Sequence, residues 1–233
     1  MNNTTKIYLG LDTTSVEYAY NLSNSLKNII DGIKIGKEFF SSNGPDGVKK
    51  LNETEIPIFL DLKFHDIPNT VYKAIKSLAG LKPKILNIHV LGGEKMLKAA
   101  RESINENFDG DKPLLIGVTL LTSLNENDIA LMGFKYNIVE TVLKLSQIAK
   151  ENELDGVVCS PLEITKVREE CGKNFTIITP GIRLDSSQND DQTRTLSPVE
   201  AKERGSDILV IGRPITTAQD PVEIAKNIKN CLI

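Results

Sequence analysis

The sequence contains no tryptophan, and aromatic residues make up only 5% of its 233 residues. Broad aromatic platforms for stacking nucleic-acid bases are therefore not expected. Basic residues are not in excess either, because the formal net charge is −3. Nucleic-acid-binding domains usually carry a strongly basic face. We therefore expect no nucleic-acid partner.

Cysteines and long apolar runs are also scarce. The three cysteines, Cys159, Cys171 and Cys231, include no C-x-x-C pair, which favours neither a disulfide framework nor a zinc site. No stretch reaches the roughly 18 apolar residues typical of a membrane-spanning helix. The polar start of the chain does not have the apolar core of a signal peptide. We expect a cytoplasmic protein with reduced thiols and no membrane association.

What the sequence does contain is a regular alternation of short β-rich runs and longer stretches of helical spacing. The runs predicted as strands are Ile7–Asp12, Gly32–Gly36, Ile56–Lys63, Ile85–Val90, Leu114–Leu120, Gly156–Ser160, Thr176–Ile182 and Ile208–Gly212. The stretches predicted as helices are Ser15–Ile30, Pro45–Leu51, Pro68–Leu81, Glu94–Asn107, Ile138–Glu151, Pro161–Glu170, Pro198–Arg204 and Pro221–Lys229.

This alternation predicts an α/β protein with parallel strands and right-handed crossovers. Eight βα units in a chain of this length favour a (β/α)8 TIM barrel that forms one domain over residues 1–233. A doubly wound open sheet is the rival, although the first βα turn lacks its G-x-G-x-x-G fingerprint. Ile67-Pro68 and Ser160-Pro161 are predicted to start helices, and Asp220-Pro221-Val222-Glu223 reads as a variant of the capping box.

In such a barrel the functional site lies at the carboxyl ends of the strands. Asp61 and Lys63 lie on one face of their strand, about 6.5–7 Å apart along the backbone, and Leu62 and Phe64 face the helices. Lys34 lies on the neighbouring strand. An inward lysine is costly unless it is paired or hydrated. Alternating charges meet that requirement and provide an ammonium group as a proton donor, although an ion network that merely fills the barrel mouth is an alternative.

Several other polar residues at the strand ends have more than one interpretation. Asp66 is either an N-cap for the helix at Pro68 or a site residue, and Asp12 is either a loop acid or a hydroxyl acceptor. His89 either faces the site, by alternation with Asn87, or is a structural histidine, which is the interpretation we favour. Spacing alone leaves open a metal site formed by Asp12, Asp61 and Asp66, but the interleaved lysines disfavour a bound cation.

A second cluster of residues favours phosphate binding. The loops after strands seven and eight, which often bind phosphate in barrels, contain Gly181-Ile182-Arg183 and Gly212-Arg213. Glycine allows a close approach to backbone N–H groups, and arginine offers a planar fork for phosphate oxygens. The polar stretch Leu184–Thr195 is long for a loop in a compact domain, which favours a lid over a solvated loop. Arg194, inside it, is interpreted as solvated.

The sequence resembles the orotidine 5′-phosphate decarboxylase family. The resemblance rests on an uninterrupted block at 61–71 and on shorter motifs in the family's order, which are Leu9-Gly10-Leu11-Asp12, Ile33-Lys34-Ile35-Gly36, Val118-Thr119-Leu120-Leu121-Thr122-Ser123, Thr179-Pro180-Gly181-Ile182-Arg183, Asp190-Asp191-Gln192 and Ile211-Gly212-Arg213-Pro214-Ile215. It spans nearly the whole chain, without a departure at a functional position.

The resemblance implies decarboxylation of orotidine 5′-monophosphate to UMP, without cofactor or metal, by a homodimer of barrels with both sites at the interface. Its implied catalytic residues are Lys63 as the proton donor to C6, Asp61 against the substrate carboxylate, and Lys34 and Asp66, the latter from the partner subunit. Its implied substrate-binding residues are Asp12 and Lys34 for the ribose, Thr70 of the partner subunit, Thr122 for the pyrimidine, and Arg183, Gln192, Gly212 and Arg213 for the phosphate.

The sequence leaves two alternative functions open. A Mg²⁺-dependent decarboxylase or aldolase of the same superfamily, acting on a sugar phosphate, shares the Asp-x-Lys-x-x-Asp pattern at Asp61, Lys63 and Asp66. The run Ile67–Thr70 and Gln192 disfavour it. A non-catalytic phosphosugar-binding barrel is the other alternative, and it has no need of a second lysine.

Overall fold

The strands close into a barrel in which every neighbouring pair is parallel. The computed structural model describes residues 5–184 and 195–232, and within them β1 to β8 follow chain order until β8 pairs with β1. The strands are β1 (Lys6–Leu11), β2 (Gly32–Ile35), β3 (Ile58–Phe64), β4 (Ile85–His89), β5 (Leu114–Val118), β6 (Gly156–Val158), β7 (Thr176–Thr179) and β8 (Ile208–Ile211). The predicted (β/α)8 barrel is confirmed, and the open-sheet rival is wrong.

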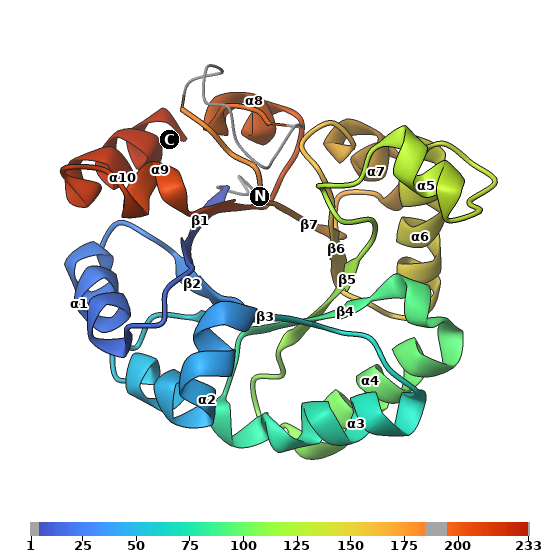
Figure 1. Ribbon diagram of the computed structural model, residues 1–233, viewed down its shortest axis with the longest axis horizontal. Helices are drawn as coiled ribbons and strands as arrows, with labels where there is room; N and C mark the ends of the chain where they lie inside the picture. Colours follow the sequence, from blue (N-terminus) through green and yellow to red (C-terminus); the bar gives the residue numbers. More distant parts are fainter. Residues whose placement is uncertain (1–4, 185–194, 233) are drawn as a thin grey trace.

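Helices form a ring around the barrel (Figure 1). They are α1 (Val16–Leu26), α2 (Lys37–Asn52), α3 (Pro68–Ser77), α4 (Glu94–Asn107), α5 (Glu126–Leu131), α6 (Ile138–Glu151), α7 (Ile164–Cys171), α8 (Pro198–Glu203), α9 (Arg213–Thr216) and α10 (Pro221–Cys231), with 3₁₀ turns η1 (Ala79–Leu81) and η2 (Val90–Gly92). Among the described residues no helix combines the length and the apolar character that crossing a membrane requires.

Several predicted helix boundaries are wrong. The stretch predicted from Pro45 is the second half of α2, which starts at Lys37 and bends at Gly44, where φ is +56°. Ser160-Pro161 does not start α7. The Glu163 carboxylate accepts a hydrogen bond from the Ser160 N–H (2.7 Å) and so stabilises a turn there, and the helix begins at Ile164. The short helices α5 and α9 lacked a sufficiently long periodic pattern to be predicted.

Other helix starts follow the predicted chemistry. Pro68 occupies the first turn of α3. The Asp220 carboxylate accepts hydrogen bonds from the N–H groups of Val222 and Glu223, both at 3.0 Å. These bonds satisfy donors that the first turn of a helix leaves without an intrahelical partner.

Side-chain alternation along the strands divides the interior into two layers. Outward-facing residues such as Leu9, Leu60 and Ile88 pack with the helices in the larger core. Leu62 and Phe64 pack against that core from β3, as predicted. A smaller inner cluster fills the barrel near the strand starts and consists of Tyr8, Phe59, Ile85, Ile116, Ile178 and Ile208. Two residues further along β3 and β4, the inward positions are the polar residues Asp61 and Asn87, which lie toward the carboxyl ends of the strands.

Candidate functional site

A cavity of about 240 Å³ opens at the carboxyl ends of the strands. It collects residues from segments far apart in the sequence, because parallel strands bring all their carboxyl ends to one side of the barrel. Among the predicted site residues, its lining includes Asp12, Lys34, Asp61, Lys63, Thr122, Arg183, Gly212 and Arg213.

The floor of this cavity is an array of alternating charges. Lys34 Nζ lies 2.8 Å from Asp12 Oδ1 and 3.8 Å from Asp61 Oδ2. On the other side of Asp61, Lys63 Nζ donates a hydrogen bond to Oδ1 at 2.6 Å. The Lys34 and Asp61 side chains are only 10% and 14% exposed, so each buried charge has opposite charges beside it. The predicted pairing of Lys34, Asp61 and Lys63 is present, with Asp12 as a further member.

Asn87 on β4 joins this array, although the sequence pattern assigned it no role. It is fully buried. Its Nδ2 donates to Asp61 Oδ1 at 2.6 Å, and its Oδ1 accepts from the Lys63 backbone N–H at 2.8 Å. The sequence signal that could have identified Asn87 is that it is the single polar residue, on the inward face, in the otherwise apolar segment Ile85–Ile88.

Asp66 and Thr70 are not in the lining of this cavity. Both are exposed, and they lie on the loop and first turn that follow β3. Asp66 is not the N-cap of α3, because that position belongs to Ile67; its carboxylate instead accepts a hydrogen bond from the Ile67 N–H (2.7 Å). Gln192, Arg194 and most of the predicted lid lie outside the described residues.

Glycines bring β1 and β8 close together beside Lys34. A Cβ atom on Gly10 would lie 3.3 Å from the Gly212 Cα and 3.6 Å from the Lys34 Cε. Gly212 precedes α9, whose first residue is Arg213. Arg183 lines the same cavity and lies in the segment after β7, where Ile182 forms a bridge with Leu196. Both predicted glycine–arginine pairs therefore meet at one cavity.

The lining carries more positive than negative charge. Lys34, Lys63, Arg183 and Arg213 oppose Asp12 and Asp61, in a protein whose net charge is −3. This arrangement suits a ligand with several negative charges. No group of three or more metal-binding side chains occurs within residues 5–184 and 195–232. Within one chain, Asp12, Asp61 and Asp66 are therefore not grouped as three ligands of one metal ion.

His89 lies at the end of β4, with its ring centroid 5.3 Å from that of His65. The pKa of His89 is lowered to about 4, mainly by burial and to a smaller extent by the neighbouring charges of His65, Lys37 and Lys63, while Asp61 acts in the opposite direction. The imidazole is therefore neutral at pH 7 and adds no charge beside Lys63.

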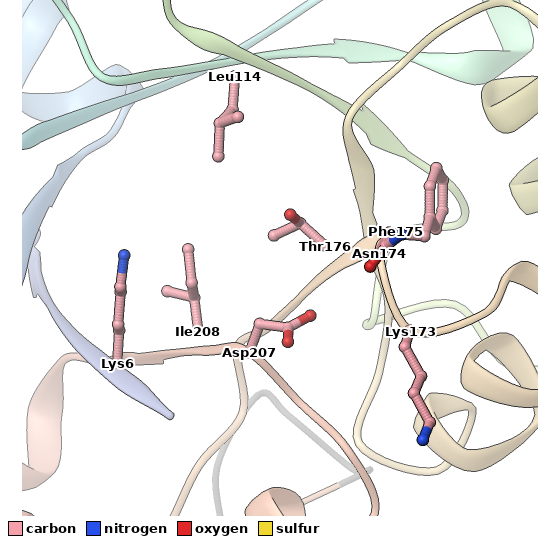
Figure 2. A pocket seen from close by; sticks show the side chains of 8 residues that line it. All are labelled: Lys6, Leu114, Lys173, Asn174, Phe175, Thr176, Asp207 and Ile208. Atoms are coloured by element: carbon pink, nitrogen blue, oxygen red, sulfur yellow. The ribbon is translucent and has the colours of Figure 1, made fainter. Parts of the chain in front are cut away.

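A second cavity, of about 330 Å³, lies at the opposite end of the barrel. Leu114, Thr176 and Ile208, each the first residue of its strand, point toward a common space, and Lys173 points away from it (Figure 2). Residues at this end of a barrel generally serve stability, whereas the opposite end carries the chemistry. Its larger volume therefore does not make it the functional site.

Comparison with known proteins places this geometry in a family. A profile of the orotidine 5′-phosphate decarboxylase / HUMPS family matches residues 5–228. The orotidine 5′-phosphate decarboxylase of Legionella pneumophila (strain Lens) is 46% identical over 221 residues, which are 95% of this chain and 96% of that protein. The enzyme of the same name from Vibrio parahaemolyticus is 48% identical over 200 residues, 86% of this chain and 85% of that protein.

Solved structures give the same result. The crystal structure of orotidine 5′-phosphate decarboxylase from Lactobacillus acidophilus superimposes with a TM-score of 0.84 at 37% identity, covering 98% of this chain and 99% of that one. A family match over nearly the whole chain, together with these full-length relatives, leaves one conclusion. The chain belongs to the orotidine 5′-phosphate decarboxylase / HUMPS family.

Proposed function

We propose that this protein decarboxylates orotidine 5′-monophosphate to UMP, the last step of de novo pyrimidine biosynthesis, without a metal or cofactor. The main observation in support of this proposal is the Lys34–Asp61–Lys63 array at the base of a cavity whose lining also includes two arginines. The relatives at 46% and 48% identity bear the name of this decarboxylase. The cationic lining suits a substrate that carries both a phosphate and a carboxylate.

The proposed chemistry centres on Lys63. As the bond between C6 and the carboxylate breaks, CO₂ leaves and its bonding electron pair stays on C6. The Lys63 ammonium stabilises that developing negative charge and then donates its proton to C6, which yields UMP. Asp61, beside it, would face the substrate carboxylate and disfavour the bound ground state.

The remaining residues would bind parts of the substrate that do not react. Asp12 and Lys34 would hold ribose hydroxyls, and Thr122 would contact the pyrimidine. The phosphate would be bound by residues of the loops after β7 and β8, namely Arg183, Gln192, Gly212 and Arg213. Binding energy from the phosphate can be used to position the reacting carbon.

We also propose a homodimer in which Asp66 and Thr70 complete the partner's site. This proposal is supported by their exposure outside the cavity of their own chain. Large apolar side chains are exposed in segments that follow β3, β4 and β5, namely Ile67, Leu91, Leu121, Leu131 and Met132. Stable monomers rarely expose large contiguous apolar patches, and loops after consecutive strands lie next to one another.

The domain and compartment are inferred in the same way. We take residues 1–233 as one catalytic domain, because the family profile extends from residue 5 to residue 228. The thiols of Cys159, Cys171 and Cys231 are reduced, and the last of them is exposed, which suits a reducing compartment such as the cytoplasm.

The function is tested by mixing the purified protein with orotidine 5′-monophosphate in excess EDTA and following loss of the orotate absorbance. Conversion to UMP supports the decarboxylase and shows that no added metal is needed. Failure to convert, together with Mg²⁺-dependent turnover of a sugar phosphate, would assign the chain to the metal-dependent relatives. Tight UMP binding without turnover of either substrate would favour the binding barrel.

The shared site has its own test. Lys63→Ala and Asp66→Ala homodimers should each be almost inactive, whereas a mixture allowed to exchange subunits should recover activity. Recovery is expected because one of the two sites in a mixed dimer then has both native residues. A mixture as inactive as its components, despite subunit exchange, would contradict a site built from two chains.

A further inference from the structure

Lys63 has an unusual backbone conformation for a residue on a strand. Its φ angle is +52°, in the left-handed region that residues with a Cβ atom rarely occupy. The pairing of β3 with β4 shifts its register across the same segment, between Leu60 and Phe64. Such a conformation persists only where surrounding contacts stabilise it. The position of the Lys63 ammonium therefore depends on the contacts that hold this backbone conformation.

Asn87 provides that contact from the neighbouring strand. Its Oδ1 accepts the Lys63 N–H at 2.8 Å, which satisfies a donor that the shifted register removes from the regular ladder. Its Nδ2 donates to Asp61 Oδ1 at 2.6 Å. The same Asp61 oxygen accepts a hydrogen bond from the Lys63 ammonium at 2.6 Å. One amide therefore contacts both the backbone of the lysine and the acceptor of its side chain.

The chemistry of these partners requires an amide at position 87. A backbone N–H needs an acceptor, and a carboxylate needs a donor, so an amide satisfies both in one orientation only. Asn87 is fully buried inside the barrel, where either partner left unpaired would carry a desolvation penalty. Leucine has nearly the same size but provides neither group. Aspartate retains the acceptor for Lys63 and places a second carboxylate against Asp61.

We propose that Asn87 is a positioning residue for the decarboxylation. It holds Lys63 in its left-handed conformation and fixes the Asp61 oxygen that aligns the Lys63 ammonium with C6. This inference rests on the proposed function and adds a residue that acts through Lys63 and Asp61 rather than by touching the substrate. A residue that only fills the core would affect stability without a specific effect on proton transfer.

The main experiment compares Asn87→Leu with wild type and with Asn152→Leu. Asn152 is a second buried asparagine, at the end of α6, where its amide donates to the Ile148 carbonyl (2.9 Å). We expect Asn87→Leu to lower kcat by about 10²-fold, the scale on which small misplacements act, with UMP affinity changed much less. Asn152→Leu should lower the Tm and retain kcat. An Asn87→Leu enzyme with near wild-type kcat would overturn the proposal.

A second readout isolates proton transfer from CO₂ loss. In D₂O, Lys63 as an amine can remove the C6 proton of bound UMP and return deuterium, the reverse of the proposed last step. Asn87→Leu should slow this exchange, measured by NMR at saturating UMP, by a factor similar to its loss of kcat. Unchanged exchange would contradict a role through Lys63. A wild-type enzyme that converts no orotidine 5′-monophosphate would refute the proposed function itself, which is a distinct outcome.

If the Asn87→Leu variant does not fold, Asn87→Asp provides an alternative test of the proposal. Its carboxylate would face Asp61, with Lys34, Lys63 and His89 as the other nearby titratable groups on β2, β3 and β4. Two carboxylates at this distance favour sharing one proton. Activity relative to wild type should therefore decrease as the pH rises and that proton is lost. A kcat–pH profile parallel to that of wild type would count against the positioning role.

Discussion

The Nζ atom of Lys34 lies 2.8 Å from Oδ1 of Asp12, yet the two side chains differ greatly in exposure, at 10% for the lysine and 63% for the aspartate. The pair therefore joins the buried base of the cavity to its solvent-facing rim. The exposed Asp12 carboxylate retains capacity to accept hydrogen bonds, as binding of a sugar hydroxyl requires. Lys34 Nζ also lies 3.8 Å from Asp61 Oδ2. The same lysine therefore interacts with the aspartate proposed to bind the ribose and with the aspartate proposed to face the reacting carboxylate.

Replacing Lys63 by alanine should remove nearly all turnover. The variant loses both the cation that stabilises the developing charge on C6 and the proton donor, and general acid catalysis alone typically contributes about 10²–10⁴-fold. UMP should still bind, because the predicted phosphate contacts remain. Steady-state kinetics and calorimetry check these outcomes. The matched control is Lys98→Ala, which removes an exposed lysine paired with Glu94 on α4 and should retain full activity.

Replacing Arg213 by alanine should affect the phosphorylated substrate selectively. A charge-assisted hydrogen bond contributes about 1.5–3 kcal/mol, which corresponds to roughly 10–150-fold in kcat/KM for orotidine 5′-monophosphate. Orotidine, which lacks the phosphate, should react with the variant and with wild type at the same slow rate. An equal loss with both substrates would show that Arg213 supports the fold of the cavity rather than binding phosphate.

Gly156→Ala should destabilise the barrel strongly. A Cβ at this position of β6 would lie 2.0 Å from the Thr176 carbonyl oxygen on β7, and backbone in a closed barrel has little freedom to move away. Overpacking of this kind costs about 1–3 kcal/mol or more. Gly80→Ala is the matched control, since nothing lies within 4 Å of its added Cβ. Urea unfolding should show a large loss of stability for the first variant only.

His89 should make the protein sensitive to acid. Its pKa is about 4 in the folded chain against an ordinary 6.5, so between these values the unfolded chain binds the proton more readily. The stability from keeping His89 neutral is present above pH 6.5 and is lost as the pH falls from there through about 4. His89→Gln should therefore lose less unfolding free energy than wild type between pH 7 and pH 4.5. Parallel pH dependences in urea titrations would contradict this cause.

The sequence was sufficient for the architecture and for most of the residues of the cavity. Regular βα alternation predicted the barrel, because each unit contains a short β-rich run followed by an amphipathic stretch. The rule that barrel chemistry lies at the carboxyl ends of the strands then selected Lys34, Asp61 and Lys63. Boundaries such as the start of α7 were wrong because a Ser-Pro pair signals a turn as readily as a helix start. Neither α5 nor α9 is long enough to show a helical period.

What the sequence determined by itself is the set of chemical groups and the side of each strand on which they lie, since alternation with a period of two is a local property of the chain. The tertiary structure decided which of those groups meet. It brought Asp12 against Lys34, left Asp66 and Thr70 outside the cavity of their own chain, and placed Asn87 between Asp61 and the backbone of Lys63. These relationships depend on the register and closure of the barrel, which no local pattern contains because strand pairing joins residues tens of positions apart.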